Sequence, residues 1–260
     1  MLTDLLRRLL PRGAPVRKPA PGFSPGAANA GGAAQPLSPD DTDPASPEGH
    51  ARHSHGLEQF LSQLTTQESL CVLDVGGATQ ANVGFLTNMG HKVYSERFLD
   101  LLDSLDKEAP DDPATAPSLA FVDTFLRQNL DFPAGWFDGV LLWDSLEFLP
   151  PPLLKATVER LYYVTKPGAY LLAYFHSDEK AAELATYSYR IRDSSTLMLA
   201  RKRMRQPCQP FNNRSVEKLF QRFQSVKFFL ARDQLREVIV RRENRKQAGR
   251  GRLDVLHFAW

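Results

Sequence analysis

Short, mostly apolar runs alternate with amphipathic segments along this chain, beginning near Gly56. Five runs are predicted to be strands, at 71–75, 91–96, 118–123, 137–144 and 169–176. Apolar residues recur at helical spacing in the segments 56–64, 82–90, 151–165 and 215–223. Strands that alternate with helices predict an α/β fold, a doubly wound and mostly parallel sheet covered by helices on both faces.

The end of the folded part has a different pattern. Residues 226–242 are two β-rich runs around a short polar turn, which is typical of an antiparallel hairpin. Together with the five earlier runs, this hairpin predicts a single seven-stranded sheet. The predicted domain therefore spans residues 56–242, and residues 243–260 form a basic tail that we expect to be flexible.

The first part of the chain differs in composition from the rest. Nine of the 19 prolines lie in the first fifty residues, among Gly, Ala and Ser. Such a segment buries too little apolar surface to offset its ordering entropy, so residues 1–55 are predicted to be a disordered leader. Residues 1–10 place leucines on one helical face. They are either a helix that contacts a membrane surface or a partner, or a frayed turn without a binding role.

Composition excludes several classes of protein. The 260 residues carry two cysteines and a formal net charge of +2, which argues against a disulfide scaffold and against generic nucleic-acid binding. No apolar run is long enough for a transmembrane helix, and charged residues interrupt any signal peptide, so a cytoplasmic location is expected. His50, His53 and His55 fall in the expected flexible leader without a second ligand cluster, so no metal site is predicted.

The stretch VLDVGGATQANVGFL carries the most chemical information. Asp74 ends a predicted strand, and Gly76 and Gly77 allow a ligand to approach the backbone where a Cβ would clash. Glu96 ends the next strand, at about the distance expected of an acid that accepts ribose hydroxyls. This pattern predicts a cofactor of the adenosine type.

The sequence resembles class I S-adenosylmethionine-dependent methyltransferases. Their first motif, acid-x-Gly-x-Gly-x-Gly, corresponds to residues 74–80, where Ala78 and Gln80 replace the second and third glycines. The Phe-Asp before the fourth strand, the Trp-Asp at its end and the Lys-Pro-Gly turn at 166–168 are similar to later motifs of the family. LEFL at 146–149 departs from the common Leu-Glu-His-Leu, and the predicted terminal hairpin fits the family's sheet.

The resemblance implies S-adenosylmethionine as the cofactor and a role for each matching position. Gly76 and Gly77 would line its methionine end, and Asp74 would hold the loop. The other implied cofactor-binding residues are Glu96 for the ribose, Phe98 and Asp123 for the adenine, and Trp143. Each also has a structural interpretation, as a turn glycine, a solvated acid, a loop cap or a core aromatic.

Methyl transfer demands alignment, exclusion of water and, for a protonated acceptor, a base. Asp144 and His176, at the carboxyl ends of predicted strands, are the candidate catalytic residues, although His176 also suits a structural role. Residues 177–214 are expected to form a substrate lid with an excess of basic side chains. The acceptor is therefore either a small molecule or an acidic substrate, unless the basic residues are only a solvated surface.

Two other functions remain open. A methyltransferase fold with weakened cofactor binding would serve as a binding or regulatory protein, and the substitutions Ala78 and Gln80 favour it. A nicotinamide oxidoreductase is the third reading, because Gly76-x-Ala78-x-x-Ala81 is a degraded dinucleotide pattern. The Trp-Asp pair and the predicted hairpin argue against the oxidoreductase.

Overall fold

A computed structural model describes residues 49–108, 118–229 and 234–243 of the chain. Its main sheet has six strands in the order β3-β2-β4-β5-β9-β8. The strands are β2 (Cys71–Asp74), β3 (Lys92–Ser95), β4 (Phe137–Trp143), β5 (Thr165–His176), β8 (Ser225–Phe229) and β9 (Leu235–Arg241). β2 to β5 are parallel, and β9 runs antiparallel to both β5 and β8, which confirms the α/β class and the terminal hairpin.

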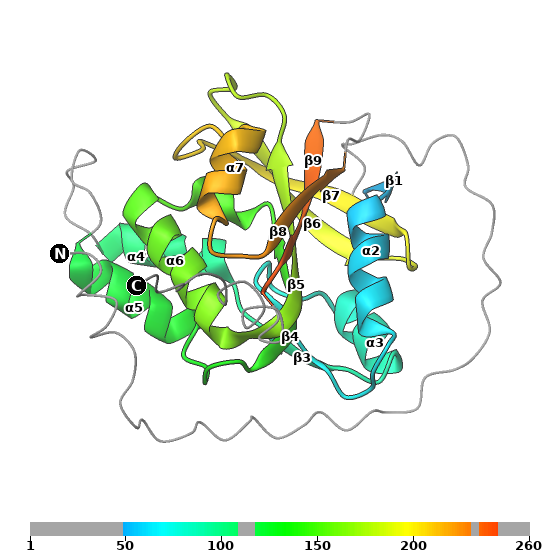
Figure 1. Cartoon of the computed structure of the whole chain (residues 1–260). Coiled ribbons are helices and arrows are strands. Elements are labelled where there is room, and N and C mark those ends of the chain that lie inside the picture. The colour runs from blue at the N-terminus through cyan, green and yellow to red at the C-terminus, as the bar shows by residue number, and fades with distance from the viewer. Residues whose placement is uncertain (1–48, 109–117, 230–233, 244–260) are drawn as a thin grey trace, which may run out of the picture.

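Helices cover both faces of this sheet (Figure 1). One face carries α4 (Phe98–Glu108), α5 (Leu119–Asn129) and α6 (Pro151–Val164), and the other carries α2 (His55–Leu64) and α3 (Gln80–Asn88). α7 (Asn213–Leu219) precedes β8. A short 3-10 turn, η2 (Ser145–Phe148), follows β4 and leads into α6.

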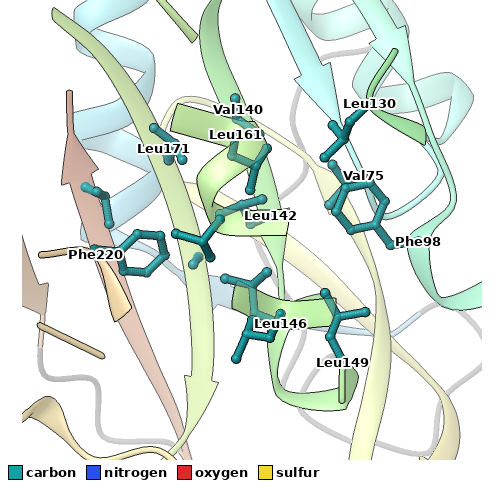
Figure 2. Packing of buried hydrophobic residues seen from close by; sticks show 14 of the residues in the cluster. Val75, Phe98, Leu130, Val140, Leu142, Leu146, Leu149, Leu161, Leu171 and Phe220 are labelled. Atoms are coloured by element: carbon teal, nitrogen blue, oxygen red, sulfur yellow. The ribbon is translucent and has the colours of Figure 1, made fainter. Parts of the chain in front are cut away.

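Two apolar cores result, one on each face of the sheet. Val140, Leu142 and Leu171 point toward α4, α5 and α6, together with Phe98 and Leu146 (Figure 2). Neighbouring strand residues such as Leu141 and Leu172 point the opposite way, toward α2. Because successive strand side chains face opposite sides, a nearly continuous apolar run is what a sheet buried on both faces requires.

The expected strand at 118–123 is wrong. Ser118 caps the helix α5 by accepting a hydrogen bond from the backbone N–H of Phe121 at 3.1 Å. The apolar positions Val122, Phe125 and Leu126 continue with helical spacing and are buried against the core. A short apolar run is compatible with a strand or a helix. Here the helical spacing of the residues that follow it favours the helix. Within the described residues, the main sheet therefore has six strands and not seven.

A second, separate sheet has the order β1-β7-β6 and is antiparallel throughout. Its strands are β1 (His50–His53), β6 (Leu184–Ile191) and β7 (Thr196–Arg205). β1 lies within the segment 1–55 that the composition predicts to be disordered, so the leader prediction is wrong for residues 50–55. Arg52 explains this order, because its buried guanidinium forms an ion pair of 2.6 Å with Glu237 in β9.

Residues 1–48 and 244–260 lie outside the described part, so the predictions for the amphipathic start and the basic tail are not addressed. Among the described residues, no helix is long and apolar enough to cross a membrane.

Candidate functional site

A pocket of about 270 Å³ lies at the carboxyl ends of β2 and β4, beneath the β6–β7 hairpin. The residues that line it are Val75, Gly76, Gly77, Thr79, Asn82, Arg97, Phe98, Leu99, Asp100, Trp143, Asp144, Ser145, Thr186, Tyr187, Ser188, Tyr189, Lys202 and Arg203. β2 has β3 on one side and β4 on the other, so the strand order reverses direction here. In open α/β sheets, ligands bind at such a switch point.

Asp74 organises the loop that follows β2. Its buried carboxylate accepts hydrogen bonds from the Gly76 N–H at 3.0 Å, the Trp143 indole N–H at 2.8 Å and the Asn82 amide at 3.3 Å. Burial raises the pKa of Asp74, while these three donors act in the opposite direction. Asp74 is not among the lining residues, so it shapes the pocket from behind.

Trp143 forms the inner wall of the pocket. Its ring stacks on Tyr189, with centroids 4.7 Å apart, and is nearly parallel to Tyr174 at 6.1 Å. A Cβ on Gly76 would lie 2.5 Å from Trp143 Cδ1, so only glycine lets the indole sit there. Trp143 also has a φ of 50°, in the left-handed region that a bulky residue adopts only where its surroundings hold it.

The backbone of the glycine loop bonds to the neighbouring loop after β3. Gly77 N–H donates to the Glu96 carbonyl at 2.8 Å, and Ala78 N–H donates to the Ser95 hydroxyl at 2.8 Å. Gly77 has a φ of 78°. With Gly76 N–H bonded to Asp74, these three donors are used within the protein. A ligand would be held by side chains and by the shape of the loop, not by these N–H groups.

Asp144 is a buried carboxyl group in the pocket wall. It is 3% exposed and accepts a hydrogen bond from the Tyr187 N–H at 3.2 Å. Burial is the main cause that raises its pKa to about 7; Glu147 adds to the effect and His176 opposes it. A carboxyl group with a pKa near neutrality is suited to accept a proton at physiological pH.

His176 ends β5 and is held by Glu147. The Nδ1 of His176 lies 2.6 Å from Glu147 Oε2, and its backbone N–H donates to Glu147 Oε1 at 3.0 Å. Burial would lower the pKa of His176, but the contact with Glu147 and the charge of Asp144 outweigh it, so the pKa is raised. His176 is not among the lining residues; its ring stacks behind that of Tyr187.

The remaining predicted cofactor residues have different positions. Phe98 lines the pocket but is fully buried, edge to face with Phe125. Glu96 is half-buried beside the pocket and is not among the lining residues. Asp123 lies in α5, where it pairs with Arg127 at 2.7 Å, so its expected place at the end of a third strand is wrong.

The contacts that assemble the site carry no signal in the sequence, although Tyr187 and Tyr189 lie within the expected lid 177–214. Asn82, almost fully buried, donates to the Tyr189 carbonyl at 3.0 Å and accepts from the Ile191 N–H at 2.8 Å, which fastens the β6–β7 hairpin to α3. Tyr187 and Tyr189 face the pocket from that hairpin. All of these contacts join segments that are far apart in the sequence. Glu147 lies within the LEFL motif at 146–149, so among these residues it is the one that a sequence motif marks.

Basic side chains from two elements meet acids at the pocket rim. Arg203 and Arg205 both pair with Asp103 of α4, the latter at 2.6 Å. Burial would raise the pKa of Asp103, but the two arginines lower it. Lys202 and Arg97 also line the rim, and Arg97 lies 3.6 Å from Asp100. The expected basic surface is therefore partly neutralised by α4.

No protein family and no curated protein matches this sequence. Among solved structures, the chain is similar to 1,6-didemethyltoxoflavin-N1-methyltransferase of Burkholderia thailandensis, crystallised with S-adenosylhomocysteine. The identity is 12%, the coverage 73% of this chain and 77% of that chain, and the TM-score 0.40. It is also similar to a SAM-dependent methyltransferase of Methanosarcina mazei, with 17% identity, coverage of 71% and 97%, and a TM-score of 0.40. A SAM-dependent methyltransferase of Aquifex aeolicus has 16% identity, coverage of 71% and 88%, and a TM-score of 0.39. At such low identity and TM-score, the likeness assigns no activity to this chain.

Proposed function

We propose that this protein is an S-adenosylmethionine-dependent methyltransferase that acts in the pocket between β2, β4 and the β6–β7 hairpin. The observation that carries the proposal is Asp144, a carboxyl group with a pKa raised to about 7 in the wall of a pocket at the switch point of the sheet. Two of the motifs that resemble the methyltransferase family, the glycine loop after β2 and Trp143-Asp144 after β4, line this same pocket.

The residues present suit this cofactor. Gly76 and Gly77 line the pocket, and their lack of a side chain lets Trp143 and Arg97 pack directly against the loop, since a Cβ would lie 2.5 Å from Trp143 Cδ1 or 3.0 Å from Arg97 Cγ. Trp143 and Tyr187 offer aromatic surfaces to a sulfonium cation. Glu96, beside the pocket, is the candidate for the ribose hydroxyls, and Phe98 is the candidate for the adenine. Asp123 pairs with Arg127 away from the pocket, so we do not propose it.

The cofactor supplies a methyl group that is already activated on a sulfonium, and the chain supplies position and protonation. Asp144, deprotonated, accepts the proton of the acceptor. Glu147 holds His176, and the charge of His176 favours the ionised form of Asp144. The β6–β7 hairpin covers the pocket and excludes water. His176 thus acts through Asp144 as a positioning residue. We propose a small-molecule or acidic acceptor.

A non-catalytic binding protein of the same fold is the second candidate. The N–H groups of Gly76, Gly77 and Ala78 are already bonded within the protein, and the Trp143 indole occupies the space beside Gly76. Both features favour weaker cofactor binding than an open glycine loop would give.

Calorimetric titration of the full chain with S-adenosylmethionine, S-adenosylhomocysteine and NAD distinguishes the candidates. Binding of both sulfur compounds, without binding of NAD, supports the proposed methyltransferase. Binding of NAD alone overturns the proposal in favour of an oxidoreductase. Binding of neither sulfur compound removes methyl transfer. Glu96→Ala should weaken cofactor binding about tenfold if Glu96 holds the ribose, as expected for the loss of one or two hydrogen bonds to a charged group. The exposed Glu68→Ala is the matched control.

A base role for Asp144 has its own test, once an acceptor is identified. Asp144→Asn should lower kcat by about 10²–10⁴ while cofactor affinity is retained. The wild-type rate should rise with pH through about 7, as Asp144 loses its proton. Unchanged kcat in Asp144→Asn would remove the assignment.

A further inference from the structure

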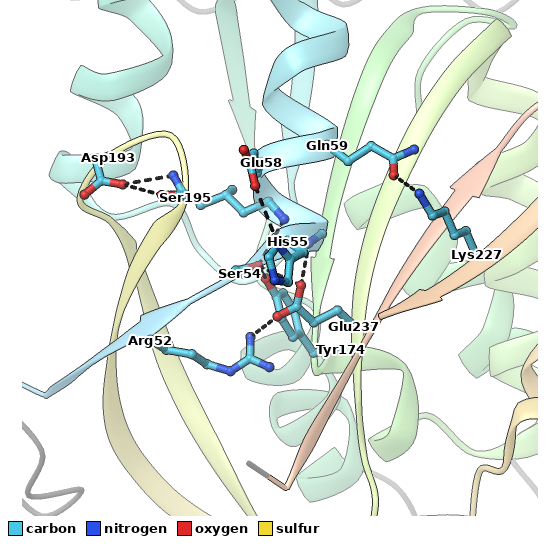
Figure 3. Close-up of polar contacts among 12 residues, drawn as sticks. Arg52, Ser54, His55, Glu58, Gln59, Tyr174, Asp193, Ser195, Lys227 and Glu237 are labelled. Carbon is cyan, nitrogen blue, oxygen red and sulfur yellow. Dashed lines mark hydrogen bonds and ion pairs between the residues drawn. The ribbon is translucent and has the colours of Figure 1, made fainter. Parts of the chain in front are cut away.

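Three side chains of metal-ligand type meet at the junction of β1 and α2, away from the pocket. They are His53, His55 and Glu58, all exposed, and their nearest ligand atoms lie within 4.8 Å of one another. The rings of His53 and His55 are 4.5 Å apart, and His55 Nδ1 lies 3.6 Å from Glu58 Oε2. Figure 3 shows His55 and Glu58 side by side at the start of α2.

The local backbone places the three side chains together. Ser54 is extended, with φ −132° and ψ 106°, so its neighbours His53 and His55 project to the same outer side while Ser54 points inward. Glu58 follows His55 by three residues, which is one turn along the same helix face.

Buried contacts hold this junction in position. The Ser54 hydroxyl donates to Glu237 at 3.0 Å and lies 2.7 Å from the Tyr174 hydroxyl, and it caps α2 by accepting from Leu57 N–H. The Ser54 N–H donates to the Ser195 carbonyl at 2.8 Å. Arg52 pairs with Glu237 on the inner side of the same turn (Figure 3). The backbone that carries the three exposed side chains is therefore ordered before any ligand arrives.

We propose that His53, His55 and Glu58 form a binding site for Zn²⁺. Two imidazoles and one carboxylate are a zinc donor set, with bonds of about 2.0–2.2 Å and water in the remaining position. Such bonds place ligand atoms about 3.3 Å apart in a tetrahedron, so small side-chain rotations close the present separations. Imidazole with carboxylate suits zinc better than calcium or magnesium, which prefer oxygen ligands only. The positive end of the α2 dipole opposes a cation, and the Glu58 carboxylate offsets this effect.

The site has a definite consequence for the fold. A zinc ion there joins the end of β1 to the first turn of α2, and it binds the folded chain more tightly than the unfolded chain because the folded junction already holds the three side chains together. It should therefore stabilise the folded chain as zinc concentration rises. β1 pairs with β7 of the pocket hairpin, so the ion fastens the strand at the rear of that hairpin.

Titration of untagged full-length protein with zinc chloride in a calorimeter tests the proposal. The expected result is one equivalent bound per chain at pH 7.5, with affinity that falls as the pH is lowered, because protons compete for imidazole. His53→Ala, His55→Ala and Glu58→Gln should each weaken that binding about tenfold or more. His50→Gln and Cys208→Ser are the matched controls, a histidine and a thiol outside the cluster, and should retain it.

Thermal unfolding with and without zinc provides a second measurement. The melting temperature of the wild type should rise with zinc, and that of the exposed-residue variants His55→Ala and Glu58→Gln should not. Binding that survives all three substitutions, or the absence of any 1:1 binding in a wild type that melts cooperatively, would overturn the proposal.

Discussion

The indole N–H of Trp143 donates to Oδ1 of Asp74 at 2.8 Å and joins the carboxyl ends of two neighbouring parallel strands, β4 and β2. The same carboxylate holds the glycine loop through Gly76 and the first turn of α3 through Asn82. One buried charge therefore positions three walls of the pocket. Burial disfavours the ionised form of Asp74, and the hydrogen bonds from these three donors offset that cost.

Trp143→Phe keeps an aromatic ring but removes one donor from the buried Asp74. We expect the free energy of unfolding to fall by about 1.5–3 kcal/mol, the range for a hydrogen bond to a charged group. Urea unfolding followed by circular dichroism measures this loss. Trp136→Phe is the matched control, since the indole nitrogen of Trp136 is buried and makes no hydrogen bond among the described residues. Equal losses in the two variants would contradict the role of the Asp74 contact.

Asp144→Asn should change the pH dependence of stability. The folded state raises the pKa of Asp144 from 3.8 to about 7. The stability linked to its protonated form is thus complete below about pH 4 and is lost as the pH rises through 7. The variant should match the wild type near pH 4 and exceed it by up to about 4 kcal/mol above pH 7, since one pKa unit corresponds to about 1.4 kcal/mol. Urea unfolding between pH 4 and 8 measures the difference. Asp178→Asn, at an exposed position, is the matched control.

Two glycine substitutions should have opposite effects. A Cβ at Gly76 would lie 2.5 Å from Trp143 Cδ1, so Gly76→Ala must displace the indole and should destabilise the fold by about 1–3 kcal/mol. A Cβ at Gly84, within α3, meets no atom within 4 Å of the described structure. Gly84→Ala should therefore stabilise the protein by about 0.5–1 kcal/mol. Melting temperatures of the two variants check the prediction, and the same sign for both would refute it.

Asn82→Ala should loosen the hairpin over the pocket. The substitution removes the bonds to Tyr189 and Ile191 and leaves those backbone groups without a partner. We expect a loss of about 2–3 kcal/mol and faster amide hydrogen exchange across residues 184–205, with little change in α6. Asn88→Ala, at an exposed position of the same helix, is the control. If amide exchange rises uniformly over the domain, the substitution destabilises the whole fold and does not act on the hairpin in particular, which would contradict this prediction.

Much of the fold follows from local patterns. The runs that form β2, β4 and β5 are almost entirely apolar, which indicates strands in a sheet that is covered on both faces. Pro151 marks the start of α6. The prediction of a strand at 118–123 is wrong because these residues, at the start of α5, suit a strand as well as a helix. The strand of residues 50–53 was missed because composition does not reveal the partner Glu237, which lies 185 residues beyond Arg52.

The sequence by itself determined the class of the fold, the turn Asp74–Gly77 and the positions of candidate acids at strand ends, because spacing and residue type express local geometry. Only the tertiary structure decided which of these groups share a pocket. It buried Asp144 against Tyr187 and brought Glu147 to His176, so that the pKa of Asp144 and the pKa of His176 are both raised. It also brought His53, His55 and Glu58 into one cluster, because the order at Ser54 depends on contacts with distant strands.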